Sequence, residues 1–279
     1  MVPAVTPPPA AVAVCGVDFT SSPSRRKPIT VAHASLQGSA MHLLRVDAHA
    51  DFRSVAHWLK QPGEWIGAFD FPFGLPRELV TALGWPLEWL ALMRHYAALP
   101  REQVRATFKA WCAARPAGAK FAHRATDGPA GSSPSMKWVN RPVAYMLHAG
   151  VPLLIEAGLH IPGLRPIECE RRVALEGYPG VLARELIGRR SYKSDDRARQ
   201  TTARREAREA LIDALEQGRT RLHLHLALNG AQRNDLLADA SGDRLDAVLC
   251  ALQAAWASRQ PHHGLPDHVD PLEGWIATA

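Results

Sequence analysis

The order of apolar and polar stretches predicts an α/β protein whose chain begins with strands. Residues 12–19 are mostly apolar on both alternating faces, which is typical of a strand in the middle of a sheet. Two more strand-like runs follow, separated by a short turn around Gly38, as expected of an antiparallel meander. A helical stretch and a fourth apolar run that ends at a Pro-rich turn come next. The predicted strands are 12–19, 29–36, 41–47 and 65–71, and the predicted helix is 51–59.

The rest of the chain is predicted to be mainly helical, with one further central strand. From Pro76 to about Pro166 the apolar positions favour helices, interrupted by a loop rich in Gly, Ser and Pro at 127–135. Within this region the run 151–155 predicts an extra strand. Because no long linker flanks the region, we interpret it as a helical insertion between the fourth and fifth strands. The fifth strand is expected at 172–176, and helices at 180–187, 195–217 and 243–259.

This organisation predicts one folded domain with short ends. Residues 1–11 are rich in Pro and Ala and are expected to form a flexible tail. Residues 12–260 form the domain, with the helical insertion at about 77–165, and 261–279 form a C-terminal tail or an edge segment. A chain of 279 residues, 47% of them hydrophobic, can bury a sizeable core.

Composition narrows the setting and the partners. A net charge of +6 favours polyanionic partners, so nucleic acid is a candidate partner. The four cysteines stand singly, without a CxxC pair, and predict neither a zinc site nor a disulfide framework. No apolar run reaches the roughly 18 residues of a membrane helix, and the N-terminal stretch has no basic start. We therefore expect a cytoplasmic protein without a membrane partner, and the sequence leaves its oligomeric state open.

Acidic residues stand at the ends of two predicted strands and on the last helix. Asp18 closes the first strand, Asp70 closes the fourth, and Asp246 flanks the apolar stripe of the final helix. The order of elements resembles the ribonuclease H-like fold, a five-stranded mixed sheet with flanking helices. That resemblance implies that the first and fourth strands are neighbours and that the last helix adds an acid at the same edge.

Crowded carboxylates raise one another's pKa unless a cation neutralises them. Mg²⁺ prefers oxygen ligands, and two such ions can activate water and stabilise the leaving oxygen in phosphodiester cleavage. Mg²⁺ or Mn²⁺ is therefore the predicted cofactor. For Asp18 and Asp70 the alternative is a turn-capping role, and for Asp243 and Asp246 it is capping of the last helix.

Other acidic and polar residues extend the predicted site. Glu176, at the end of the fifth strand, is either a further ligand, a substrate contact or an exposed strand-end residue. The predicted catalytic residues are Asp18, Asp70, Asp246 and Glu176, the metal ligands are Asp18, Asp70, Asp243 and Asp246, and the substrate-binding residues are Thr20, Ser21, Lys27, Arg124 and Lys137.

Four short motifs resemble the family named domain of unknown function 429. They are GVDFTSS at 16–22, FDFPFGLP at 69–76, EGYP at 176–179 and DRLDA at 243–247. The resemblance covers roughly residues 12–260 and implies a ribonuclease H-like fold, a metal site and a nuclease-type activity without an established substrate. Gly177 departs from the strand-type residue expected at its position.

The favoured function is Mg²⁺- or Mn²⁺-dependent phosphodiester hydrolysis by a ribonuclease H-like nuclease, and the substrate stays open between RNA, DNA, a hybrid and a small phosphoester. An actin-like ATPase or kinase relative is one alternative, but the turn after Asp18 lacks the Gly with which such proteins bind phosphate. The other alternative is a non-catalytic adaptor that binds nucleic acid or protein through a basic track, with Trp138 as a stacking surface. That track comprises Arg25, Arg26, Lys27, Arg124, Lys137 and Arg141.

Overall fold

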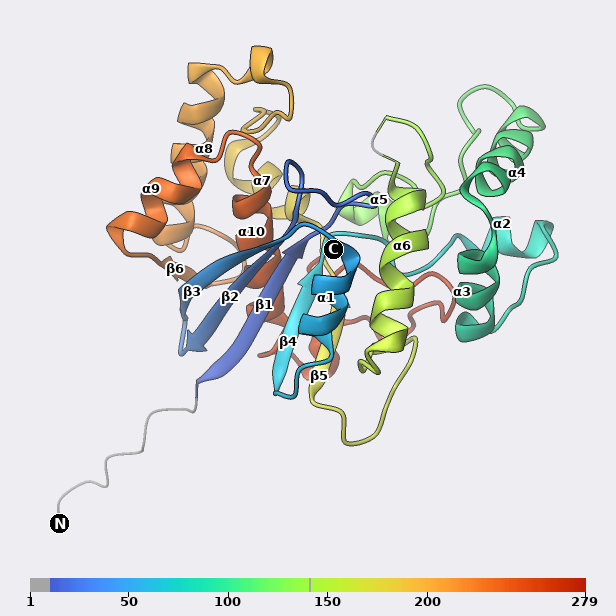
Figure 1. Ribbon diagram of the computed structural model, residues 1–279, viewed down its shortest axis with the longest axis horizontal. Coiled ribbons are helices and arrows are strands. Elements are labelled where there is room, and N and C mark those ends of the chain that lie inside the picture. The colour runs from blue at the N-terminus through green and yellow to red at the C-terminus, as the bar shows by residue number, and fades with distance from the viewer. Residues whose placement is uncertain (1–10, 141) are drawn as a thin grey trace.

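A six-stranded mixed sheet forms the centre of the protein in the computed structural model, which describes residues 11–140 and 142–279 (Figure 1). The strand order is β5-β4-β1-β2-β3-β6. The pairs β1/β2 and β2/β3 are antiparallel, whereas β1/β4, β4/β5 and β3/β6 are parallel. The elements in chain order are β1 (Val12–Asp18), β2 (Ile29–Gln37), β3 (Ala40–His49), α1 (Phe52–Leu59), β4 (Trp65–Phe69), α2 (Arg77–Ala82), α3 (Trp89–Ala98), α4 (Arg101–Ala113), α5 (Asp127–Ala130), α6 (Val143–Glu156), β5 (Arg172–Glu176), α7 (Pro179–Ile187), η1 (Arg197–Arg199), α8 (Thr202–Glu216), β6 (His225–Ala227), α9 (Gly230–Ala238), α10 (Asp243–Ala257) and η2 (Pro261–Gly264).

The predicted α/β class and the antiparallel meander of the first three strands are confirmed by this sheet. The predicted number of five strands is too low, because β6 adds a sixth at the edge beside β3. β6 has only three residues, and its partners on β3 are Ala40, Met41 and His42. A strand this short carries too little alternation to be recognised from sequence.

The extra strand predicted at 151–155 is wrong, because these residues belong to α6. Leu147, Val151 and Leu154 are buried at helical spacing, so the apolar run covers one side of a helix. A short apolar run looks the same in a buried strand and in a buried helix, and periodicity alone cannot separate the two.

The charged helix predicted at 195–217 begins later than expected, at Thr202. The side chain of Thr201 accepts the backbone N–H of Arg204 and so caps the start of α8. The residues before this cap form the short turn η1, where Asp196 accepts the N–H of Ala198.

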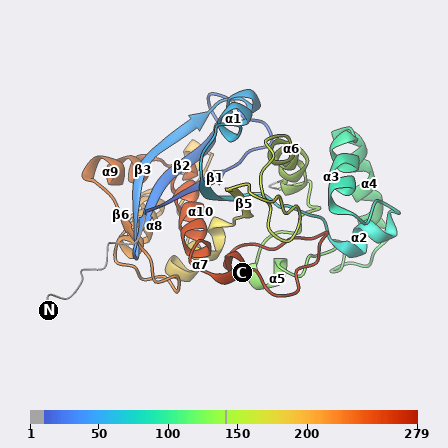
Figure 2. The same cartoon turned by 90° about the horizontal axis from the view of Figure 1, so that it is seen from below.

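Helices cover both faces of the sheet (Figures 1 and 2). α10 packs against β1, β2 and β4 on one face, with α7 and α8 beside it. α1 and α6 cover the other face, and Figure 2 shows α2, α3 and α4 standing beyond them. On β1, Val14 faces α10, whereas Cys15 and Val17 face the opposite core. None of the helices in the described part of the chain is long and apolar enough to span a membrane.

The last residues of the chain run along the edge strand β5. Ile276 forms a parallel bridge with Glu176, whose carbonyl oxygen accepts the N–H of Ala277 at 2.8 Å. The side-chain amide of Gln253 on α10 donates to the Ala277 carbonyl at 2.9 Å and to the Thr278 hydroxyl at 2.8 Å. Of the two alternatives for 261–279, the structure shows an edge segment at this end. Of the predicted N-terminal tail 1–11, residues 1–10 lie outside the described residues.

Candidate metal centre

Three carboxylates meet where β1 and β4 end. Asp18 is the last residue of β1, and Asp70 follows β4 directly. Val17 pairs with Phe69 in the parallel ladder, and the N–H of Asp70 donates to the Val17 carbonyl at 2.8 Å, so Asp18 and Asp70 emerge side by side. Asp246 reaches them from the first turn of α10. One carboxylate oxygen of each residue lies within 4.8 Å of those of the other two, a spacing at which this acidic triad could hold a metal ion.

Gly16 allows β1 and α10 to approach closely. A Cβ atom at this position would lie 2.0 Å from the carbonyl oxygen of Ala247 and 2.1 Å from the nitrogen of Ala251, so no side chain fits. Gly16 and Asp18 share one face of the strand because side chains alternate. The backbone contact at Gly16 therefore places Asp18 beside the helix turn that carries Asp246.

Replacing Gly16 with Ala should push α10 away from β1 and separate Asp18 from Asp246. We expect the free energy of unfolding to fall by about 1–3 kcal/mol, because the added methyl group has no space. Mn²⁺ should also bind more weakly. Urea denaturation and Mn²⁺ titration measure the two effects.

The matched control is Gly230→Ala on α9, where a Cβ atom meets nothing within 4 Å. This variant should keep wild-type stability or gain slightly, because Ala favours helix. Wild-type Mn²⁺ affinity in Gly16→Ala would contradict the role assigned to the glycine.

Burial dominates the electrostatics of the acidic triad. Asp246 is 0% exposed and Asp18 is 7% exposed. Burial raises the pKa of the Asp18 carboxyl well above its ordinary value of 3.8. The ammonium of Lys193 opposes this rise in pKa, whereas the negative charges of Asp243 and Asp70 add to it. A bound cation would relieve both the desolvation and the repulsion of these carboxylates.

Metal binding at the acidic triad should weaken as the pH falls through the raised pKa of Asp18. An exposed aspartate loses its proton near pH 3.9, but the buried Asp18 keeps it to a higher pH, and a metal must then displace that proton. Mn²⁺ affinity is thus expected to rise between about pH 5 and about pH 7.5. Mn²⁺ titrations across this range measure the effect, and a constant affinity would contradict it.

Two residues without a sequence signal surround Asp246. The hydroxyl of Tyr192 donates a hydrogen bond to Oδ1 of Asp246, and the Nζ atom of Lys193 forms an ion pair with Oδ2. Both come from the irregular segment between α7 and η1, where no motif or periodicity marked them.

Asp243 lies beside the acidic triad and is neutralised by the protein itself. Its Oδ1 atom accepts a hydrogen bond from Nζ of Lys27 at 2.7 Å, and the same ammonium binds Asp195 at 2.6 Å. Asp243 was predicted to bind metal, but it stands outside the group of three residues whose oxygens converge. Lys27 was predicted to bind substrate, but these two carboxylates engage its ammonium, which joins the loop after β1 to α10.

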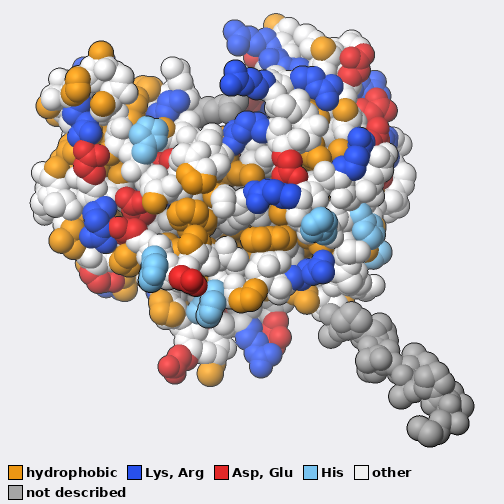
Figure 3. Space-filling view, turned by 180° about the vertical axis from the view of Figure 1, so that it is seen from behind, with side chains coloured by type: hydrophobic (Ala, Val, Ile, Leu, Met, Phe, Trp, Pro, Cys, Tyr) orange, Lys and Arg blue, Asp and Glu red, His pale blue; other side chains and the backbone are white. Residues whose placement is uncertain are grey.

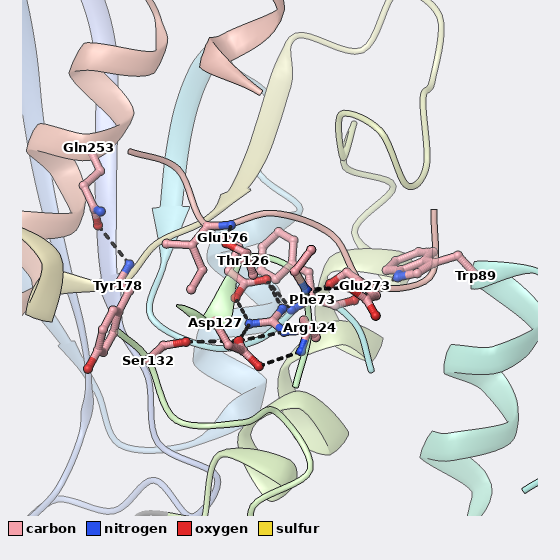
Figure 4. A network of polar contacts seen from close by, with 12 residues as sticks. Phe73, Trp89, Arg124, Thr126, Asp127, Ser132, Glu176, Tyr178, Gln253 and Glu273 are labelled. Atoms are coloured by element: carbon pink, nitrogen blue, oxygen red, sulfur yellow. Dashed lines mark hydrogen bonds and ion pairs between the residues drawn. The ribbon is translucent and has the colours of Figure 1, made fainter. Parts of the chain in front are cut away.

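Glu176 lies on the opposite face of the sheet from the acidic triad. Phe69 pairs with Glu176 in the β4/β5 ladder, and Asp70 is the next residue, so the side chains of Asp70 and Glu176 point to opposite faces. The Glu176 carboxylate accepts the N–H of Phe73 at 2.9 Å and pairs with Arg124 (Figure 4). This placement corrects the prediction that Glu176 acts together with the three aspartates.

Gly177 directly follows β5 and faces α10. A Cβ atom there would lie 3.1 Å from Sγ of Cys250 and 3.2 Å from Cβ of Ala68. The glycine that departs from the expected strand pattern is thus explained by close packing between the end of β5 and α10.

Arg124 belongs to a buried ion network and not to a substrate surface (Figure 4). It is 3% exposed, and its guanidinium makes five hydrogen bonds, with Asp127, Glu176 and the carbonyl oxygen of Glu273. Since a guanidinium has five N–H donors, these contacts within the described residues use them all. The prediction that Arg124 binds substrate is corrected accordingly.

The other predicted substrate contacts lie in two separate loops. Thr20 and Ser21 lie two and three residues after Asp18 and are half-buried, and the Ser21 carbonyl accepts from the guanidinium of Arg101 at 2.6 Å. They therefore stand next to the acidic triad in the chain.

Lys137 and Trp138 belong to the insertion, ahead of α6. Trp138 packs on Phe121, with ring centroids 5.7 Å apart. Arg141, the last member of the predicted basic track, lies outside the described residues.

Fold and site define an α/β protein with a buried centre of three converging carboxylates. The chain belongs to the family described as "Protein of unknown function (DUF429)", whose model matches residues 16–270, and the resemblance seen in the motifs is confirmed. The match includes the whole acidic triad. No curated protein and no solved structure matches the chain. The family description names no activity, so the chemistry of the site is the basis for a function.

Proposed function

We propose that this protein is a Mg²⁺- or Mn²⁺-dependent phosphodiester hydrolase of the ribonuclease H type. The observation that carries the proposal is the convergence of Asp18, Asp70 and Asp246 at the ends of two adjacent parallel strands. Carboxylate oxygens without thiolate or imidazole partners are the ligand set that suits Mg²⁺ and Mn²⁺. A bound ion would polarise the phosphodiester and activate water.

The topology supports this proposal. β1 and β4 are neighbours in the sheet, as the resemblance to the ribonuclease H-like fold implies, and β2 is antiparallel to both of its neighbours. In that arrangement acids from the first and fourth strands and the last helix share one edge, as they do here. β6 and the helices from α2 to α6 would be additions to the common core.

The chain's own residues would orient the carboxylates and set the charge around them. Tyr192 holds one oxygen of Asp246, which fixes the rotation of that carboxylate. Lys27 pairs with Asp243 and so reduces the negative charge beside the acidic triad. Burial of Asp18 and Asp246 makes their attraction for a cation stronger than in water.

Basic side chains around this end of the molecule favour nucleic acid as the substrate. Arg25 and Arg26 are exposed in the loop after β1, and Arg197 and Arg199 are exposed in η1. Lys27 connects these two segments through Asp195. Figure 3 shows Lys and Arg side chains gathered toward the top of the molecule, where they would attract the phosphates of a polyanion.

The test is a cleavage assay with purified protein. The substrates are single-stranded RNA, single-stranded DNA, duplex RNA, duplex DNA, an RNA–DNA hybrid and a small phosphodiester. We expect cleavage that requires Mg²⁺ or Mn²⁺ and stops when EDTA is added. Nucleic-acid binding without cleavage, indifferent to metal, would instead favour the adaptor. Release of phosphate from ATP alone would favour the ATPase or kinase alternative.

A further inference from the structure

The acidic triad already contains a cation that belongs to the chain. The ammonium of Lys193 pairs with Oδ2 of Asp246, the most deeply buried carboxylate of the three. Among the neighbouring charges, that of Lys193 has the largest effect on the pKa of Asp18, which it lowers. Its side chain remains 28% exposed, so it reaches the carboxylates from the solvent side. A counter-ion of the protein thus lies where a metal ion would have to bind.

Contacts on both sides hold the backbone around Lys193 in place. The N–H of Ser194 donates to the Ala240 carbonyl at 3.1 Å, and Asp195 is bound to Lys27. Gly242 before α10 has φ +77°, and a Cβ atom there would lie 2.6 Å from Cβ of Lys193. The stem of the lysine therefore has a defined place. Its four-carbon side chain can still rotate the ammonium out into solvent without moving this backbone.

We propose that Lys193 is a displaceable counter-ion, which neutralises the acidic triad in the metal-free protein and is expelled when a divalent cation binds. The inference rests on the proposed metal site. A metal ion lies only about 2.1 Å from its carboxylate ligand. An ammonium on the same carboxylate would therefore lie close to the metal ion, and the two positive charges would repel each other strongly. Lys27 cannot take this part, because Asp195 and Asp243 hold it.

The first test compares Mn²⁺ binding to wild-type protein, Lys193→Met and Lys193→Gln, by electron paramagnetic resonance of free Mn²⁺. We expect both variants to bind Mn²⁺ about tenfold more tightly or better, since no cation has to be displaced. Lys60→Met is the control, because Lys60 is exposed at the end of α1 and away from the acidic triad. It removes one positive charge as well, and its affinity should stay within about threefold of wild type.

The second test uses the wild-type protein, so it does not depend on how a variant folds. Lysine amines are acetylated with an N-hydroxysuccinimide ester, with and without saturating Mg²⁺, and quantified by mass spectrometry. Labelling of Lys193 should rise several-fold when Mg²⁺ is present, because the ammonium leaves Asp246. The exposed Lys60 should react equally in both conditions.

The outcomes separate this inference from the proposed function. Unchanged or weaker Mn²⁺ binding in both Lys193 variants, with unchanged labelling, overturns the displacement but leaves the metal site standing. Mn²⁺ binding by the Lys193 variants but not by the wild-type protein supports the displacement of Lys193. If neither wild type nor variants bind Mn²⁺, the inference and the proposed hydrolase function fall together.

Discussion

Asp18→Asn should abolish metal-dependent cleavage and make the metal-free protein more stable. Asn has the same shape as Asp but cannot supply the negative oxygen that a metal needs, so we expect activity to fall about 10³-fold or more. Asp18 is buried with its pKa raised, so ionising it opposes folding, and its neutral replacement removes that opposition. If Asp18 had a purely structural role, Asp18→Asn would instead lower the stability of the metal-free protein.

The sign of the stability change follows from linkage. A carboxyl whose folded pKa is raised favours folding most below its unfolded pKa, and this contribution is lost as the pH rises through the folded pKa. The advantage of Asp18→Asn should therefore be small near pH 4 and largest at about pH 7.5. Urea denaturation in EDTA at both values measures it.

Asp243→Asn is the control for this experiment. It removes an acid from the same region, but one that pairs with Lys27 and lies outside the acidic triad. We expect its activity to stay within about tenfold of wild type. If it proved as inactive as Asp18→Asn, the set of metal ligands would have to include Asp243.

The three aspartates could be found from sequence because each is marked by local periodicity. Asp18 and Asp70 end apolar runs, and Asp246 flanks an apolar helical stripe. Their partners Tyr192 and Lys193 lie in an irregular segment. The position of that segment depends on packing between distant parts of the chain, which leaves no periodic trace in the sequence.

Glu176 shows a second limit of the pattern. Its place at the end of a strand was predicted, but the face to which it points depends on the register between β4 and β5. A shift of one residue turns every side chain to the other face, and a single strand does not contain that information. In the structure Gly177 lies on the face of the sheet that carries the acidic triad. Glu176 lies on the opposite face and pairs with Arg124.

Arg124→Met is expected to cause the largest loss of stability. The side chains of Arg124, Asp127 and Glu176 are 1%, 0% and 3% exposed, so the change leaves two buried carboxylates without their cation. Removing one partner of a buried ion pair costs about 3–5 kcal/mol. The exposed pair of Arg171 and Glu64 provides the control, and Arg171→Met should change stability by less than about 1 kcal/mol.

The loss in Arg124→Met should also depend on pH. Burial already raises the pKa of Glu176, while the Arg124 guanidinium holds it down. Without the guanidinium this pKa rises further, so the variant loses stability as the pH increases from about 4.5, and its deficit against wild type is smaller at about pH 5 than at about pH 7.5. Urea denaturation at these two values gives the comparison.

The triple variant Arg124→Met, Asp127→Asn, Glu176→Gln separates an ion network from a substrate contact. Neutral amides leave no unpaired charge in the interior, so much of the stability lost in the single variant should return. Mn²⁺ affinity should stay near wild type in the folded triple variant, because Glu176 and the acidic triad lie on opposite faces of the sheet. A raised KM with wild-type stability in Arg124→Met would instead restore Arg124 as a residue that contacts substrate.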